Sequence, residues 1–363
     1  MFRQQQFPQQ GMLKTCFHQT RHRPFVFLCI GESCLYFILH AFISQNVASC
    51  GKILIMKIKA IGLVSGGLDS IIATCLMLEQ GIEVIPVMFV SPFFHSKYMK
   101  EKEIDFMGLK AKIIRVGDDY LSLVKNPEFG YGAGMNPCID CKIYMVKKGA
   151  EIMAKEKASF IFTGEVLDQR PFSQRQKFFD IIEKKSGMEG KILRPLSALL
   201  LKPTIPEIEK IVNREKLLAI SGRSRKQQLL IAQEKGIKTY LPPAGGCLLT
   251  DRIYAGKIKE LLEKRQQCDL DDAELIKHGR VFWYNSILIV IGRNECENKI
   301  ILNLTKKNDV SLVIKNVPSP LCIIRGNEIN NEVIEYAKEK VLTYTKQEKL
   351  KKVPSPLWEI KKH

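Results

Sequence analysis

The chain has 363 residues, of which 45% are hydrophobic and 26% are charged. This length suggests two domains, each large enough to bury a core, and the composition excludes a disordered chain, a collagen and a disulfide-stapled miniprotein. The formal net charge of +18 indicates a surface that attracts polyanions, so nucleic acid is the first partner to consider.

The first 55 residues differ from the rest of the chain. A glutamine-rich start and a basic stretch precede an apolar run over residues 25–43, which Glu32 interrupts. The run imitates a signal peptide only loosely, and a central charge would be costly in a membrane span. We therefore predict that residues 1–55 are a non-native or mis-assigned extension, that Met56 is the functional start, and that the protein does not associate stably with a membrane.

From Met56 onward, short apolar runs alternate with amphipathic stretches, which predicts an α/β fold with a parallel sheet covered by helices. Ligands in such sheets bind beyond the C-terminal ends of the strands, so the loops that follow the strands matter most. We predict that this domain covers residues 56–265. Its expected strands are residues 58–64, 84–90, 111–116 and 159–163, and its expected helices are residues 70–80, 97–109 and 141–155.

The composition and the predicted elements change in the second half of the chain. Residues 169–265 are rich in Lys and Arg and end in a predicted helix at 258–267. Beyond it we predict a smaller C-terminal α+β domain over residues 270–345, followed by a basic, frayed tail over residues 346–363. The expected elements of the smaller domain are strands at 280–283, 286–291, 299–304 and 310–314 and a helix at 331–345.

A glycine-rich turn joins the first predicted strand to the first predicted helix. It reads Ser65-Gly66-Gly67-Leu68-Asp69-Ser70. Its glycines permit close backbone approach, and main-chain N–H groups at a helix start can receive a phosphate. The Gly-Lys-Ser/Thr ending of a Walker loop is absent. The turn resembles the PP-loop of the ATP pyrophosphatase superfamily.

This resemblance implies a Rossmann-like sheet of the PP-loop (HUP) type and a reaction in which ATP transfers AMP to a substrate oxygen. Asp69 would help to place Mg²⁺. The resemblance also implies nucleotide contacts at the ends of two later strands, although Glu165 departs from the usual His or Asp after the second of them. The implied ATP-binding residues are Ser65, Gly66, Gly67, Asp69, Ser70, Phe89, Thr163 and Gly164.

Three cysteines limit the kinds of reaction that the sequence suggests. Cys138 and Cys141 stand at the start of a helix, whose positive end would lower their pKa values, and Cys247 follows a second glycine-rich turn. The close pair is more typical of metal or redox chemistry in a reducing cytoplasm than of a secreted disulfide scaffold, so we predict a cytoplasmic protein. The arrangement resembles that of the tRNA thiolases of the same superfamily.

Two sulphur mechanisms stay open. In the first, Cys247 carries a persulfide that Cys141 attacks to release sulphide. In the second, Cys138, Cys141 and Cys247 ligate a 4Fe-4S cluster whose fourth iron binds the incoming sulphide. A structural zinc site and chemically inert cysteines are the alternatives.

Several further stretches resemble tRNA thiouridylase-like proteins, which are relatives of the 4-thiouridine and 2-thiouridine synthases. They lie at residues 164–174, 193–198 and 222–226. The resemblance implies ATP-dependent thiolation of a tRNA uridine, with tRNA and a persulfide carrier or sulphide as partners. Because basic side chains bind phosphate oxygens, the candidate RNA contacts are Arg170, Arg194, Arg223, Arg225 and Lys226.

Residues 281–326 resemble the RNA-binding domain of NFACT proteins, which implies that the C-terminal domain holds RNA. Two other functions remain: a PP-loop ligase that adenylates a small molecule, and a nonenzymatic RNA-binding protein with a residual nucleotide site. The three cysteines and the basic second half disfavour the first, and the intact Asp69 and Ser70 disfavour the second.

Overall fold

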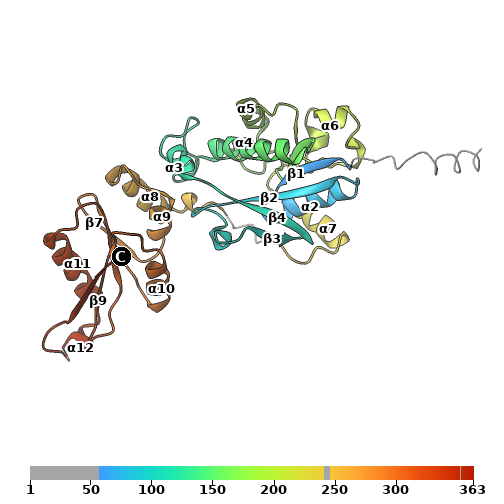
Figure 1. The fold of residues 1–363 in the computed structure, drawn as a ribbon. Helices are drawn as coiled ribbons and strands as arrows, with labels where there is room; N and C mark the ends of the chain where they lie inside the picture. The colour runs from blue at the N-terminus through green and yellow to red at the C-terminus, as the bar shows by residue number, and fades with distance from the viewer. Residues whose placement is uncertain (1–56, 241–245, 352) are drawn as a thin grey trace, which may run out of the picture. The chain divides into compact units, whose positions relative to one another are not determined.

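The computed structural model describes residues 57–240, 246–351 and 353–363. These residues form two sheets with helices packed on them (Figure 1). The extension predicted at residues 1–55 lies outside the described residues, as do residues 241–245 of the turn before Cys247. In the described part, no helix is both long enough and apolar enough to cross a membrane.

The first sheet confirms the predicted Rossmann-like α/β fold. Its strands lie in the order β3-β4-β2-β1-β5-β6, and all neighbours are parallel except β3 and β4. The strands are β1 (Lys59–Leu63), β2 (Glu83–Val90), β3 (Glu103–Phe106), β4 (Leu109–Arg115), β5 (Phe160–Thr163) and β6 (Ile192–Leu193). The main helices of this domain are α2 (Leu68–Leu78), α3 (Asp118–Lys125), α4 (Cys138–Glu156), α5 (Gln176–Ser186), α6 (Ile205–Ile208) and α7 (Lys226–Glu234).

Helices cover both faces of the first sheet. Because successive side chains of a strand point to opposite faces, Ala60 and Phe160 pack with α2 and α7, whereas Ile61 and Ile161 pack with α3, α4 and α5. Figure 1 shows α4 and α5 on one side of the sheet and α2 and α7 on the other. Burial on both faces explains why these strands are apolar throughout rather than alternating.

The helix predicted at residues 97–109 is wrong. After the short 3₁₀ turn η2 (Ser96–Tyr98), this segment forms a hairpin of β3 and β4. Met107 and Gly108 have φ values of 58° and 76°, the left-handed conformation that a tight hairpin connection requires. The charged side chains of Glu103 and Asp105 lie on the exposed side of an edge strand, not on a helix face.

The second sheet confirms the predicted smaller α+β domain. Its antiparallel strands lie in the order β11-β9-β10-β8-β7, and α11 (Asn331–Tyr344) packs on one face through Val333, Ala337 and Val341. The strands are β7 (Arg280–Tyr284), β8 (Ile287–Ile291), β9 (Val310–Ile314), β10 (Cys322–Arg325) and β11 (Trp358–Lys362). Helices α8 (Arg252–Lys264) and α9 (Leu270–Leu275) precede the first strand of this sheet. The other helices that follow are α10 (Glu295–Asn303) and α12 (Gln347–Leu350).

Two expectations for this region are wrong. The strand predicted at residues 299–304 falls largely in α10, whose start is capped by Asn294, since its side chain accepts the N–H of Glu297 at 2.9 Å. Such a cap favours a helix over the strand that the apolar residues alone suggest. The tail predicted to fray also has structure, because β11 pairs with β9 from Trp358 to Lys362.

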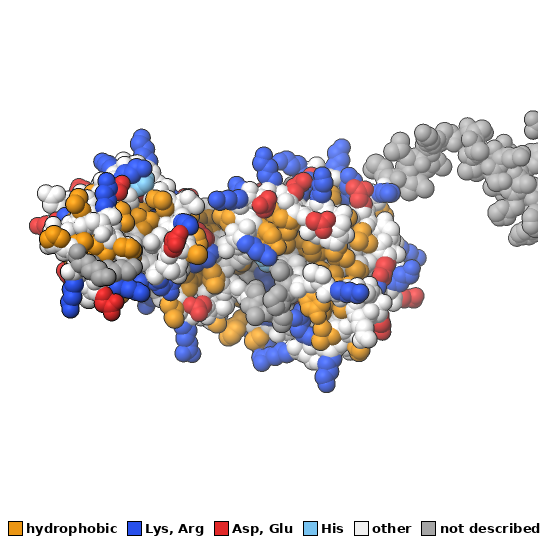
Figure 2. Space-filling model, turned by 90° about the horizontal axis from the view of Figure 1, so that it is seen from below, with side chains coloured by type: hydrophobic (Ala, Val, Ile, Leu, Met, Phe, Trp, Pro, Cys, Tyr) orange, Lys and Arg blue, Asp and Glu red, His pale blue; other side chains and the backbone are white. Residues whose placement is uncertain are grey.

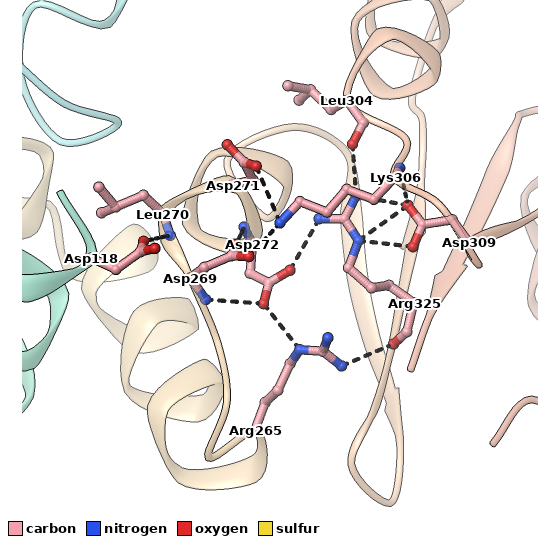
Figure 3. Close-up of polar contacts among 10 residues, drawn as sticks. All are labelled: Asp118, Arg265, Asp269, Leu270, Asp271, Asp272, Leu304, Lys306, Asp309 and Arg325. Atoms are coloured by element: carbon pink, nitrogen blue, oxygen red, sulfur yellow. Dashed lines mark hydrogen bonds and ion pairs between the residues drawn. The ribbon is translucent and has the colours of Figure 1, made fainter. Parts of the chain in front are cut away.

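A buried ionic network joins α9 to the second sheet (Figure 3). The Arg325 guanidinium donates to both oxygens of Asp309 at 2.7–3.1 Å, to Asp272 at 3.0 Å and to the Leu304 carbonyl at 2.6 Å. The other oxygen of Asp272 accepts from Arg265 at 3.0 Å. Arg325 and both carboxylates are almost completely buried, so each charge depends on the others for compensation.

Replacing Arg325 with methionine should destabilise this domain by about 3–5 kcal/mol, because two buried carboxylates lose their partner. The chain has two tryptophans, Trp283 and Trp358, and both lie in this domain, so urea unfolding followed by tryptophan fluorescence measures the effect. Lys315→Ala, which removes an exposed 3.8 Å pair with Glu359, is the control and should cost less than about 1 kcal/mol. Equal unfolding midpoints for the two variants would contradict the prediction.

Candidate active site

The glycine-rich turn lies between β1 and α2. Gly66 has a φ of 72°, a conformation that glycine adopts without strain. The Ser70 hydroxyl donates to the Gly67 carbonyl at 2.8 Å and accepts the Ser65 N–H at 3.4 Å, so it closes the turn. Gly67 is the N-cap of α2 and has no side chain to cap it. The N–H groups of the first helical turn are therefore left for an anion.

The turn that follows β5 packs directly on this loop. A Cβ atom at Gly164 would lie 2.5 Å from the Ser70 nitrogen and 2.7 Å from the Asp69 carbonyl carbon. Because these are backbone atoms, no side-chain rotation can relieve the overlap. Thr163 and Gly164 thus lie beside the residues that the sequence predicts to bind phosphate.

Phe89 is placed differently from the other predicted nucleotide contacts. Its side chain is buried in the core on the α3–α4 face of the sheet, and its backbone belongs to the ladder between β2 and β4. Any contact with a nucleotide would therefore involve the end of β2 rather than the exposed face of this ring.

Asp69 has two partners from distant parts of the chain. Its Oδ2 atom accepts from Gln169 Nε2 at 3.2 Å and lies 3.6 Å from Arg225 Nη2. Asp69 Oδ1 and Arg225 Nε are both buried, and neither has a hydrogen-bond partner among the described residues. The sequence grouped Arg225 with the RNA contacts and did not single out Gln169. The structure brings both to the phosphate loop.

Glu165, the departure from the superfamily pattern, belongs to an ionic network. It pairs with Lys142, which follows Cys141 in α4, and accepts from Arg194 at 3.3 Å. Burial alone would raise the pKa of Glu165, but Lys142 and Arg194 outweigh it and hold that pKa below its usual value. Glu165 is therefore a carboxylate that holds the start of α4 next to the turn at Gly164.

The three candidate cysteines come together from two segments. Cys138 and Cys141 lie in the first turn of α4, and Cys247 precedes the 3₁₀ turn η5 (Leu248–Thr250). Backbone hydrogen bonds hold η5 in place: the Leu248 N–H donates to the Phe93 carbonyl at 2.8 Å, and the Leu249 carbonyl accepts the N–H of residue 135 at 2.9 Å. Each of the three cysteines is partly exposed.

The predicted lowering of the cysteine pKa values is wrong. Burial raises the pKa of Cys141 and of Cys247 to about 12, and it also raises the pKa of Cys138. The neighbouring cysteines also raise the pKa of Cys141 and of Cys247, whereas the charge of Arg170 lowers the pKa of Cys138 and Cys247. Loss of solvent thus outweighs the helix end, and with nothing bound the three side chains are neutral thiols at neutral pH.

The three cysteines have the chemistry of ligands for a 4Fe-4S cluster. Within the described ranges, no three His, Cys, Asp or Glu side chains are close enough together to hold one metal ion. A 4Fe-4S cluster does not require the thiols to meet at one point, because each cysteine binds a different iron. The buried Tyr120 hydroxyl lies close enough to Cys141 for each to affect the pKa of the other, and hydrogen bonds to the sulphurs tune iron–sulphur sites.

The candidate RNA contacts separate into two groups. Arg170, Arg223 and Lys226 are exposed. Arg194 is only 4% exposed, donates to Glu183 at 2.6 Å as well as to Glu165, and therefore does not present its guanidinium to an RNA backbone. Figure 2 shows Lys and Arg side chains scattered over the visible face among acidic ones, not gathered in one stripe.

Gly164→Ala should abolish binding of pyrophosphate and ATP, because the added methyl group forces the turn away from the Asp69–Ser70 peptide. Isothermal titration calorimetry measures the binding, and circular dichroism checks that the domain folds. Gly256→Ala is the control: this residue lies in α8 with open space around its Cα, so binding should not change. Nucleotide binding by Gly164→Ala at the level of the control would contradict the prediction.

Two family models match the chain. The model for thiamine biosynthesis protein (ThiI) matches residues 56–221, and the model for the NFACT protein RNA binding domain matches residues 279–356. Neither match includes residues 222–278. Arg225 and Cys247 are therefore placed at the site by the three-dimensional structure and not by these models.

Similar proteins agree with these matches. Probable tRNA sulfurtransferases of Methanosarcina mazei and Thermococcus kodakarensis are each 31% identical to this chain, over 31% and 39% of its length and 29% and 37% of their own. The chain thus spans about a third of these relatives. A solved 4-thiouridine synthetase–RNA complex with bound ATP has 21% identity and a TM-score of 0.36, covering 56% of this chain and 50% of the other. Residues 56–221 are thus similar to the ThiI family, and residues 279–356 are similar to the NFACT RNA-binding domain.

Proposed function

We propose that this protein is an ATP-dependent tRNA sulfurtransferase, which adenylates a uracil carbonyl oxygen and then replaces that oxygen with sulphur. The main support for the proposal is that the turn after β5 contacts both the glycine-rich turn and the helix that carries Cys138 and Cys141. Thr163 and Gly164 lie on the phosphate loop, and the next residue, Glu165, holds the helix that begins with Cys138 and Cys141. ATP chemistry and sulphur chemistry thus share one edge of the sheet.

The first half-reaction takes place at the phosphate loop. The uracil oxygen attacks the α-phosphorus of ATP, the bond to the bridging oxygen breaks, and pyrophosphate leaves. The N–H groups at the start of α2 bind the phosphates, and Asp69 helps to hold Mg²⁺. Arg225 then turns from Asp69 to the phosphates, where its guanidinium stabilises the negative charge that develops on pyrophosphate.

The second half-reaction takes place at the cysteines. Sulphide attacks the activated uracil carbon, the carbon–oxygen bond breaks, and AMP leaves with the oxygen. Cys138, Cys141 and Cys247 would hold a 4Fe-4S cluster, which would supply an iron without a protein ligand as a place for sulphide. In the other route, Cys141 attacks a persulfide on Cys247, which releases sulphide and leaves a disulfide between the two residues.

The partners are tRNA and a sulphur donor. The exposed side chains of Arg170, Arg223 and Lys226 supply positive charge for the RNA backbone, and the charge of Arg170 also reaches Cys138 and Cys247. The C-terminal domain adds a second RNA-binding surface. The donor is sulphide or a persulfide carrier. The reaction is cytoplasmic, in keeping with free cysteines throughout the described residues.

Cys138 distinguishes the two sulphur routes. Asp69→Asn and Cys247→Ser should each abolish formation of the thionucleoside, measured by mass spectrometry of tRNA nucleosides from a deletion strain that expresses the variant. Cys138→Ser should abolish it as well, because the cluster loses a ligand, whereas the persulfide route does not use this thiol. The control is Cys296→Ser, an exposed cysteine of the second domain. Activity of Cys138→Ser equal to the control would exclude the cluster.

Arg225 and Arg223 make a matched pair for the ATP site. Arg225→Ala should lower kcat/KM for ATP by about 10- to 100-fold, because a charge-assisted contact worth roughly 1.5–3 kcal/mol is lost. Arg223→Ala, which removes an exposed arginine two residues away, should leave this constant unchanged and weaken tRNA binding instead. Release of pyrophosphate and filter binding of tRNA measure the two effects. If Arg225→Ala weakens only tRNA binding, Arg225 is the RNA contact that the sequence predicts.

A further inference from the structure

Tyr120 is a buried tyrosine in the wall of the cysteine site. It lies in α3, is fully inaccessible to solvent, and packs among aromatic rings. The ring centroids of Phe93, Phe94 and Tyr144 lie 6.0, 5.9 and 5.4 Å from its own. These contacts fix the direction in which its hydroxyl points.

The Tyr120 hydroxyl faces sulphur. Cys141 lies within range to influence the pKa of this hydroxyl through a side-chain hydrogen bond, and Cys247 and Cys138 are close enough for their charges to act on it. The hydroxyl has no partner of full hydrogen-bond geometry among the described residues. A buried hydroxyl without a partner is unfavourable, and phenylalanine would fill the same space without that cost.

The two neighbouring tyrosines do not share this property. The Tyr144 hydroxyl donates to Asp119 at 3.0 Å, and the Tyr254 hydroxyl donates to the Ala273 carbonyl at 2.8 Å. Both hydroxyls are therefore explained by contacts within the protein. Of the three hydroxyls, that of Tyr120 alone lacks a partner among the described residues, so a group bound by the cysteines is available to it.

We infer that Tyr120 is a positioning residue that donates a hydrogen bond to sulphur of the cluster held by Cys138, Cys141 and Cys247. This inference rests on the cluster route of the proposed function. A donor directed at a cluster sulphur stabilises the more negative, reduced state and so raises the reduction potential. Removing the hydroxyl should shift the reduction equilibrium about tenfold toward the oxidised state. For a one-electron reduction, this shift lowers the reduction potential by about 59 mV.

The test compares Tyr120→Phe with Tyr144→Phe, which removes a hydroxyl with its own protein partner from the same aromatic group. The full chain and both variants are loaded with iron and sulphide under anaerobic conditions. Iron and labile sulphide per chain are measured first, and the midpoint potential is then titrated by visible absorbance and electron paramagnetic resonance. We expect equal cluster content in all three proteins, a midpoint about 59 mV lower in Tyr120→Phe, and no change in Tyr144→Phe.

The inference would be overturned by an unchanged midpoint in Tyr120→Phe, by an equal shift in both variants, or by a wild-type chain that assembles no cluster. A Tyr120→Phe protein that cannot assemble the cluster would also contradict it, because a hydrogen-bond donor is not a ligand. Thionucleoside content of tRNA is measured separately, so a failure of the thiolation proposal is distinguishable from a failure of this one. Thermal unfolding should show Tyr120→Phe at least as stable as the wild type.

Discussion

The close approach of Gly164 to the first turn of α2 is the constraint on which the candidate site depends. β1 and β5 are parallel neighbours with Leu63 opposite Thr163, so the loops that follow them leave the sheet at the same edge. The two backbones then meet with no room for even a methyl group. The phosphate loop therefore keeps its shape only while the turn after β5 stays in place, and the position of Asp69 relative to Gln169 and Arg225 depends on both.

The same turn carries the connection to the cysteines. Glu165 is enclosed by Lys142 and Arg194, and a carboxylate in that position is stable only because two cations compensate it. A buried network of this kind contributes little net stability, but it allows few alternative arrangements. Here it fixes the start of α4, and so Cys138 and Cys141, relative to the nucleotide turn. The proposed reaction would benefit from that fixed geometry, because adenylation of the uracil oxygen and attack of sulphur on the adjoining carbon involve one carbonyl group.

The properties of the three cysteines agree with the proposal that they bind a positively charged group such as a 4Fe-4S cluster. Burial raises the pKa values of its thiols, so thiolates form only when a positive group compensates the charge. Arg170 provides part of that compensation from the exposed side. The Tyr120 hydroxyl adds a donor on the buried side.

Features that depend on neighbouring residues could be predicted from the sequence. The apolar runs predicted a parallel sheet, and Ser65 to Ser70 between a strand and a helix predicted a phosphate loop, because glycine freedom and exposed N–H groups are local properties. The sequence predicted the wrong element where a short stretch is compatible with both a helix and a strand. Examples are the hairpin at Met107, which was predicted as a helix, and the capped helix after Asn294, which was predicted as a strand. The partner of each charged side chain, by contrast, depends on the three-dimensional packing of the chain. Arg194 and Arg225 were both predicted from the sequence to contact RNA. In the structure, Arg194 is buried against two carboxylates, whereas Arg225 faces Asp69. Strand order and helix packing, not sequence spacing, bring these groups together.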